Sequence, residues 1–235
     1  MAIDCYLAMT AAEIASTPSL PGKIGYMACH FSPYSTGLSN LPQQLPPDSI
    51  LLVTDRIPIC GHDPELIARQ LSDSVKLHRC RSVLLDFQRG GCEETARLVR
   101  HLAARLPCPA AVSQPYADGV DCPILLPPVP LDIPPADYLS PWMGRSLWLE
   151  LAGDSLRITV TPEGTHFSPA PSDPLPLPHQ DHRLCCHYRT EVSPEKATFT
   201  LQRTPEDLHS LLEEAEPLGV SLAVGLYQEL GNLGI

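Results

Sequence analysis

The sequence predicts an α/β fold, a compact and irregular (β/α)8 barrel with an antiparallel β insertion near residues 153–202. Short, continuously apolar segments recur along the chain and alternate with amphipathic helical segments. This alternation is typical of a parallel sheet covered on both faces. From Gly153 the pattern changes to alternating apolar and polar residues, which indicates antiparallel strands. An open doubly wound sheet is the alternative architecture.

Eight β-branched or apolar runs supply the predicted barrel strands. They are Cys5–Met9, Ile24–Cys29, Ile50–Thr54, Val83–Phe87, Ala110–Ser113, Ile124–Leu126, Leu147–Leu151 and Val220–Tyr227. Helices are predicted where a capping residue precedes an apolar stripe. These are a short helix after Thr10, one from Asp63 to about His78, one over Glu93–Leu106 and one after Thr204.

The antiparallel insertion begins with a hairpin. Leu156–Thr161 and Thr165–Phe167 flank the turn Pro162-Glu163-Gly164. Two further strands are expected at Leu184–Tyr188 and Ala197–Leu201. The hairpin at 156–167 is either an edge that pairs two copies of the chain in a homodimer or a lid over one end of the barrel. Because no linker stands out, residues 1–235 are predicted to form a single domain.

Composition excludes several classes of protein. A chain of 235 residues with 43% hydrophobic residues can bury a core, so it is not a disordered chain. A net charge of −11 without a basic cluster argues against nucleic acid as a partner. No run is long enough for a membrane helix, and the N-terminus lacks the features of a secretory signal. The nine scattered cysteines favour reduced thiols and a cytoplasmic location.

Polar side chains gather where the predicted strands end. Ligands of parallel α/β folds bind at the carboxyl ends of the strands, so these residues are the candidate site. The candidate catalytic residues are Asp86 and Glu150, and the candidate ligand-binding residues are Asp55, Gln88, Arg89, Gln114, Tyr116, Tyr227 and Gln228. Carboxylates, amides and tyrosines on one rim suit a carbohydrate or another polar small molecule. The alternative is a structural or interaction protein, in which Arg56 and Arg89 close the rim by pairing with the carboxylates.

The segment Ser-Val-Leu-Leu-Asp-Phe-Gln at 82–88 resembles the fourth barrel strand of chitinase-like glycoside hydrolases of family 18. Their strand reads D-x-x-D-x-D-x-E, in which the last Asp positions the substrate acetamido group and the Glu protonates the glycosidic oxygen. Asp86 matches that last Asp, and Gln88 falls on the acid. Tyr227 stands where the last strand of the family often has a Trp. The resemblance implies a (β/α)8 barrel with a carbohydrate groove.

The chain departs from this motif at three positions. Leu84 and Arg81 replace the two earlier aspartates, and the carboxamide of Gln88 has no acidic proton to donate near neutral pH. The departure predicts a protein that has lost family 18 hydrolysis and keeps a sugar-binding groove. An active hydrolase is the alternative, in which Asp86 and Glu150 form the carboxylate pair at a separation of about 5–9.5 Å.

A second cluster combines imidazoles and thiols between residues 179 and 187. An active hydrolase could instead hold a metal through His179, His182, Cys185 and His187. Their spacing is not a usual zinc pattern, so we predict no metal site and no cofactor. If Leu184–Tyr188 is a strand, Cys185 and His187 lie on the same face of it. Motifs for phosphate binding or for a serine nucleophile are absent from the sequence.

Overall fold

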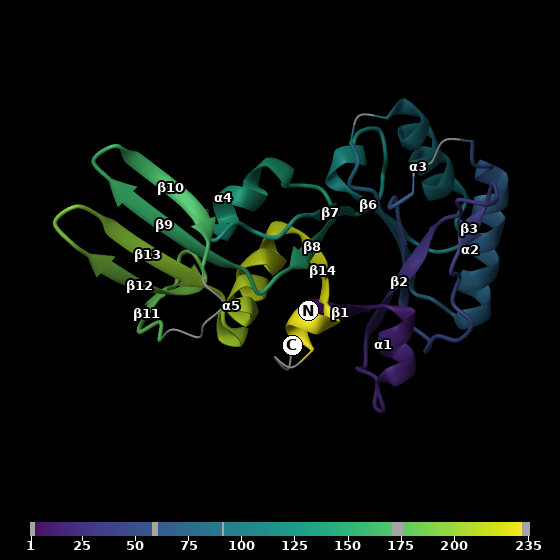
Figure 1. Ribbon diagram of the computed structural model, residues 1–235. Helices are drawn as coiled ribbons and strands as arrows, with labels where there is room; N and C mark the ends of the chain where they lie inside the picture. The colour runs from purple at the N-terminus through teal and green to yellow at the C-terminus, as the bar shows by residue number, and fades with distance from the viewer. Residues whose placement is uncertain (1–2, 58–60, 91, 171–175, 232–235) are drawn as a thin grey trace.

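The computed structural model describes residues 3–57, 61–90, 92–170 and 176–231 (Figure 1). Within them, eight parallel strands close into a barrel, because β1 pairs with β14 on one side and with β2 on the other. The barrel strands are β1 (Asp4–Met9), β2 (Ile24–Phe31), β4 (Ile50–Thr54), β5 (Ser82–Asp86), β6 (Ala110–Ser113), β7 (Ile124–Leu126), β8 (Leu147–Leu151) and β14 (Val220–Leu226). The predicted barrel is confirmed.

Helices cover the outside of most of the barrel. They are α1 (Ala11–Ser16), α2 (Pro64–His78), α3 (Glu93–Arg105), α4 (Pro135–Leu139), α5 (Pro205–Ala215) and α6 (Tyr227–Leu230), with the 3-10 turns η1 (Gln114–Tyr116), η2 (Ser140–Trp142) and η3 (Glu216–Leu218). The carboxylate of Asp63 caps α2 by accepting the N–H groups of Glu65 and Leu66. No helix of the described residues is long and apolar enough to cross a membrane.

The two faces of the barrel strands bury different side chains. Every second residue of a barrel strand points inward, as the two-residue period of a strand requires. In several strands these are the even-numbered residues. The inner cluster consists of Tyr6, Ala8, Ile50, Leu52, Leu84, Ala111, Leu125, Trp148, Leu222 and Val224. Residues of the opposite parity, such as Val53 and Leu85, pack against the surrounding helices. The barrel interior is therefore a filled core.

A five-stranded antiparallel sheet projects from one side of the barrel (Figure 1). It contains β9 (Ser155–Thr161), β10 (Gly164–Pro169), β11 (His179–Asp181), β12 (Cys186–Val192) and β13 (Ala197–Gln202), in the order β10-β9-β13-β12-β11. This sheet is inserted in the sequence between β8 and α5, which confirms the predicted insertion. Its apolar face packs with Leu131, which follows β7. A further short strand, β3 (Leu38–Ser39), pairs antiparallel with β2.

The predicted start of one insertion strand is wrong. β12 begins at Cys186, and Cys185 has a left-handed backbone with φ of 48°. The carboxylate of Asp181 accepts the N–H groups of Arg183 and Leu184, which forms a tight turn before the strand. Cys185 and His187 therefore do not lie on one strand face, because Cys185 belongs to the turn.

Candidate functional site

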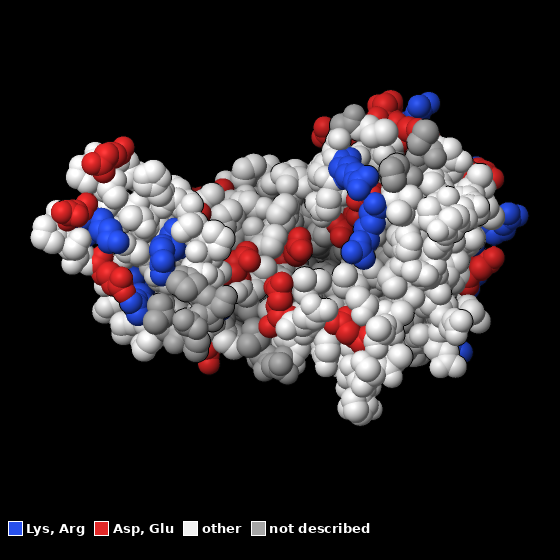
Figure 2. Space-filling model, viewed as in Figure 1, with Lys and Arg blue, Asp and Glu red and all other residues white. Residues whose placement is uncertain are grey.

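Asp86 and Glu150 line one small cavity at the carboxyl ends of the barrel strands. The cavity has a volume of about 60 Å³. Apart from these two carboxylates and Thr54, its lining is apolar: Ala8, Met27, Leu52, Leu84, Leu125, Val224, Gly225 and Leu226. Figure 2 shows a hollow near the centre of this face, with acidic side chains beside it and basic side chains along one side.

Strand register brings the two carboxylates together. Asp86 ends β5 opposite Thr54 of β4, and Glu150 lies opposite Val224 of β14. Each carboxylate comes two positions after an inward-pointing core residue. Asp86 follows Leu84, and Glu150 follows Trp148. The same parity that fills the barrel core thus places both carboxylates at its mouth.

Hydrogen bonds fix the carboxylate of Asp86. Its Oδ1 accepts the side-chain amide of Gln88 and the hydroxyl of Ser113, the latter at 3.1 Å. Burial raises the pKa of Asp86, and the two hydrogen bonds offset part of that effect. Gln88 is thus a neighbour of Asp86, and its amide acts as a donor to the carboxylate.

Glu150 has the more strongly perturbed carboxylate. Burial raises its pKa to about 7, and the negative charges of Asp86, Glu229 and Asp154 contribute to the rise. A carboxyl with such a pKa holds its proton through much of the neutral range and can exchange it there. A general acid needs this property.

Three other predicted residues form a support on one side of the mouth. The backbone N–H of Arg89 donates to Asp55 Oδ2 at 2.8 Å, and the Arg89 guanidinium donates to the carbonyl of Arg56 at 3.2 Å. The hydroxyl of Tyr116 donates to the carbonyl of Arg89. The Tyr116 ring is buried in the outer cluster against Phe87. Asp55 and Tyr116 therefore hold the loop that carries Arg89.

The remaining predicted residues lie apart from the cavity lining. Gln114 is exposed at the start of η1, directly after β6. Tyr227 packs against the outer cluster formed by β8, β14 and α5, so its ring turns away from the barrel axis. Gln228 is exposed and its side chain hydrogen-bonds Glu13, a residue of α1. All three follow the end of a strand, Gln114 and Tyr227 by one position and Gln228 by two, where a new turn sets the direction of the side chain.

The imidazoles and thiols of residues 179–187 separate in space. His187 Nδ1 hydrogen-bonds Asp207 Oδ2 at 2.7 Å, while the His179 ring packs against Tyr188 in a tilted arrangement with 5.3 Å between centroids. Cys185 is buried in the outer cluster of the barrel. Across the described residues, no group of three or more His, Cys, Asp or Glu side chains is placed to hold a metal ion.

The sequence prediction did not include three residues that belong to the mouth. Ser113 bonds Asp86, Thr54 lines the cavity, and Glu229 affects the charge of Glu150. The alternation of inward and outward residues could have indicated Thr54 and Ser113, because each is the last inward-pointing residue of its strand. Glu229 is a carboxylate just after the last predicted strand, a position that indicates the rim, and the turn of α6 sets its direction.

Comparisons with known proteins find similarity in structure alone. No protein-family model matches the chain, and no curated protein matches its sequence. The spore cortex-lytic enzyme SleL of Bacillus cereus aligns over 95% of this chain and 70% of its own, with 10% identity and a TM-score of 0.57.

Two enzymes of glycoside hydrolase family 18 align over nearly their whole length. An N-acetylglucosaminidase of Paenibacillus barengoltzii covers 95% of this chain and 94% of its own, with 9% identity and a TM-score of 0.58. A mutant chitinase of Cycas revoluta in complex with (GlcNAc)4 covers 94% of each chain, with 11% identity and a TM-score of 0.57. The chain therefore has a barrel fold similar to that of glycoside hydrolase family 18 enzymes.

Proposed function

We propose that this protein binds a carbohydrate at the mouth of its barrel and does not hydrolyse it by the family 18 mechanism. One observation carries the proposal: the side chain two positions after Asp86 is Gln88, whose amide donates to the Asp86 carboxylate. An amide cannot protonate a leaving group. The bond instead keeps Asp86 oriented, with its second oxygen able to accept a hydroxyl or an amide N–H.

The shape of the cavity supports a ligand that rests on the mouth. A cavity of about 60 Å³ takes one small group, so the bulk of a sugar would lie above Asp86 and Glu150. The similar chitinase structures of Cycas revoluta are complexes with (GlcNAc)3 and (GlcNAc)4, which makes N-acetylglucosamine oligomers the first probe.

Calorimetric titration with (GlcNAc)4 tests the proposal. The wild-type chain is expected to bind the oligomer and to release no shorter product. Asp86→Ala should weaken binding at least about tenfold, because a hydrogen bond to a charged group contributes about 1.5–3 kcal/mol. Ser16→Ala, on the exposed helix α1, is the control and should bind as wild type. An Asp86→Ala protein that binds like the wild type would refute the site.

A gain-of-function variant tests the loss of hydrolysis. Gln88→Glu restores a carboxyl at the position that the family motif assigns to the acid. We expect measurable release of shorter oligomers from (GlcNAc)4, while the wild type releases none. Gln114→Glu, on the neighbouring strand end, adds the same charge and should release none.

A second candidate is an active hydrolase in which Glu150 is the acid. Its raised pKa and its place in one cavity with Asp86 favour this reading. Product release by the wild type, with a rate that falls as pH rises through about 7 and that Glu150→Gln abolishes, would replace the first proposal.

We also infer that the hairpin of β9 and β10 pairs two copies of the chain. β10 is an edge strand, and Phe167 on it is 58% exposed. Light scattering should give a dimer that Phe167→Glu converts to a monomer, whereas His166→Glu, on the opposite face of the strand, should leave the dimer intact. A wild-type monomer would exclude the pairing.

We keep the cytoplasmic location as a proposal. All eight cysteines of the described residues are free thiols, which supports a reducing compartment. Fractionation of the source cells with an antibody to the protein would test it.

A further inference from the structure

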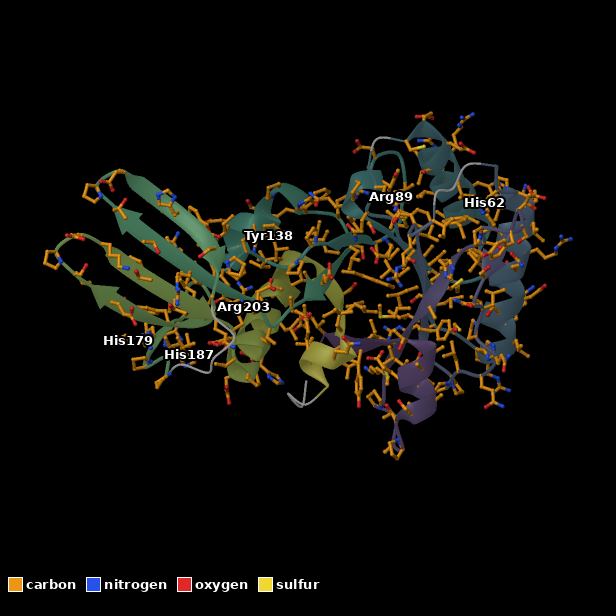
Figure 3. All side chains as sticks on the ribbon, viewed as in Figure 1. His62, Arg89, Tyr138, His179, His187 and Arg203 are labelled. Atoms are coloured by element: carbon orange, nitrogen blue, oxygen red, sulfur yellow. The ribbon has the colours of Figure 1, made fainter. Side chains whose placement is uncertain are left out.

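A second hollow lies where the antiparallel sheet meets the barrel. It has a volume of about 410 Å³. We call it the junction pocket, and its lining consists of Gly153, Leu177, His187, Gln202, Arg203, Thr204, Pro205 and Glu229. Figure 3 shows His187 and Arg203 near this junction, with Arg89 on the other side of the barrel.

One wall of the junction pocket is a row of polar side chains across three strands. His187 of β12 lies directly opposite Gln180 of β11 on one side and Gln202 of β13 on the other. Residues opposite each other in antiparallel strands point to the same face of the sheet. An imidazole between two carboxamides therefore stands on the face that is turned toward α5.

Asp207 holds the imidazole in one orientation. Its side chain is fully buried, and Oδ2 accepts His187 Nδ1 at 2.7 Å together with the N–H and hydroxyl of Thr204. Oδ1 accepts the amide of Gln180 at 3.2 Å. Burial by itself raises the pKa of Asp207, but these hydrogen bonds outweigh it and lower the pKa, so the carboxylate is ionised.

An ionised acceptor determines which atoms His187 offers to the pocket. Nδ1 must carry the proton that it donates to Asp207, so in the neutral imidazole Nε2 is an acceptor. The His187 side chain is 27% exposed while Asp207 is fully buried. The exposed edge of the ring is therefore the one that holds Nε2.

The only guanidinium among the lining residues is already used by the protein. Arg203 donates to four backbone carbonyls, those of Val129, Pro130, Leu184 and Cys185. The groups that remain for a ligand are His187 Nε2, the Gln202 amide and the Glu229 carboxylate, and most of them accept hydrogen bonds. Such a set suits a ligand rich in hydroxyl groups and disfavours an anion.

The junction pocket neighbours the barrel mouth. Glu229 lines the pocket, and its charge acts on Glu150 in the mouth cavity. Gly153 also lines the pocket and lies two residues after the end of β8, the strand that carries Glu150. A ligand of several sugar units that starts at the mouth therefore meets the junction pocket next.

We propose that the junction pocket is a second binding subsite, in which His187, Gln202 and Glu229 accept the hydroxyl groups of a sugar ring that lies outside the barrel mouth. The inference rests on the proposed function, since it assigns the next unit of the same ligand. It makes the protein a binder of oligomers, with an affinity that rises with chain length.

Titrations with the single sugar GlcNAc and with (GlcNAc)4 test the subsite. The wild type should bind the tetramer at least about tenfold more tightly than the single sugar, the effect of an added hydrogen bond to a charged group such as Glu229. His187→Gln and Gln202→Ala should each reduce tetramer affinity toward that of GlcNAc and leave the affinity for GlcNAc unchanged. His209→Gln, an exposed histidine on α5 outside the pocket, should bind both ligands as wild type.

The ring signals of His187 provide an independent readout. In NMR spectra of the wild-type protein, the tetramer should shift the His187 resonances, which the His187→Gln spectrum identifies, and the single sugar GlcNAc should shift them less. Gln202 is exposed, so Gln202→Ala keeps the test valid if His187→Gln unfolds.

The outcomes separate this inference from the proposed function. Tetramer binding that depends on Asp86 but not on His187 or Gln202 overturns the subsite and leaves the proposed function intact. Tetramer binding that depends on His187 but not on Asp86 supports the subsite and overturns the barrel-mouth site. If neither GlcNAc nor (GlcNAc)4 binds, the subsite and the barrel-mouth site are both overturned.

Discussion

Two carboxylates of the mouth have different surroundings, although they line one cavity. Asp86 receives hydrogen bonds from Gln88 and Ser113, whereas burial and three negative neighbours act on Glu150. Burial of a carboxyl near other negative charges costs stability once the group ionises. Residues that destabilise a fold are common at functional sites, which supports a role for Glu150 in binding or catalysis.

The raised pKa of Glu150 predicts how stability depends on pH. The folded state holds this proton up to about pH 7, whereas the unfolded state holds it only to about pH 4.5, the ordinary pKa of a glutamate, so the contribution of Glu150 to stability falls as pH rises between those values. Glu150→Gln should therefore be stabilising at pH 8, by at most about 3 kcal/mol, and nearly neutral at pH 4.5. Urea unfolding at both pH values measures this difference. An equal effect at the two pH values would contradict the raised pKa.

At the scale of elements, α5 is fixed at its first turn. Thr204 and Asp207 form a reciprocal capping box, and the same carboxylate binds His187 of β12. One buried side chain thus starts the helix and attaches it to the antiparallel sheet. This arrangement gives the junction pocket a rigid wall.

Replacing Asp207 tests that attachment. Asp207→Asn should lower the free energy of unfolding by about 1.5–3 kcal/mol at pH 7, because the charged carboxylate accepts hydrogen bonds from His187, Thr204 and Gln180 that a neutral amide cannot all accept. The lowered pKa of Asp207 means that its stabilising effect is present above the unfolded pKa and is lost as pH falls through the folded value. The variant and the wild type should therefore converge in acid. Glu206→Gln, an exposed neighbour in the same turn, should leave stability unchanged.

α6 packs on β14 through a glycine. A Cβ at Gly225 would lie 2.1 Å from Leu230 Cδ1 and 2.9 Å from the carbonyl oxygen of Leu151. Gly225→Ala should destabilise the protein by about 1–3 kcal/mol and should displace α6, which carries Glu229. Gly22→Ala, where nothing lies within 4 Å of a Cβ, is the control for thermal unfolding. If the Gly225→Ala protein is as stable as the control, α6 can move away without a loss in the free energy of unfolding, and the prediction is wrong.

At the scale of the whole molecule, Arg203 joins the barrel to the antiparallel sheet. Its buried guanidinium binds carbonyls that follow β7 and carbonyls of the turn before β12. Buried carbonyls without a donor are costly, so the two parts are expected to unfold together.

Calorimetry tests this coupling and the predicted single domain. The wild type should show one cooperative transition. Arg203→Met should lower the free energy of unfolding by at least about 3 kcal/mol, because several buried carbonyls lose their donor. Arg183→Met, an exposed arginine in the preceding turn, is the control. Two transitions in the wild type would contradict a single domain.

Much of the barrel was predictable from local patterns. Ile50–Thr54, Ala110–Ser113, Ile124–Leu126 and Leu147–Leu151 have the predicted bounds, because a fully buried strand is a continuous apolar run with a polar end. Asp63 and Pro64 likewise indicate the start of α2. Short elements such as β3, β11 and α4 were missed, since tertiary pairing and not an apolar period creates them.

The candidate site was predictable only in part. Asp86 and Glu150 sit inside strands, where the two-residue period determines which way a side chain points. Tyr116 and Tyr227 lie just beyond strand ends, where a turn sets the direction, and both rings pack on the outer side of the barrel. The link from Asp207 to His187 joins residues that are 20 positions apart, and no local pattern predicts such a contact.

The sequence by itself determined the fold class, the insertion and the absence of an acid at Gln88, because each depends on residues that are adjacent or regularly spaced. Closure of the barrel, the cavity shared by Asp86 and Glu150, and the junction pocket were decided only by the tertiary structure. Closure requires β1 to pair with both β2 and β14, and β14 lies at the far end of the chain. Strand pairing over that distance is set by packing of the whole core, which no local segment encodes.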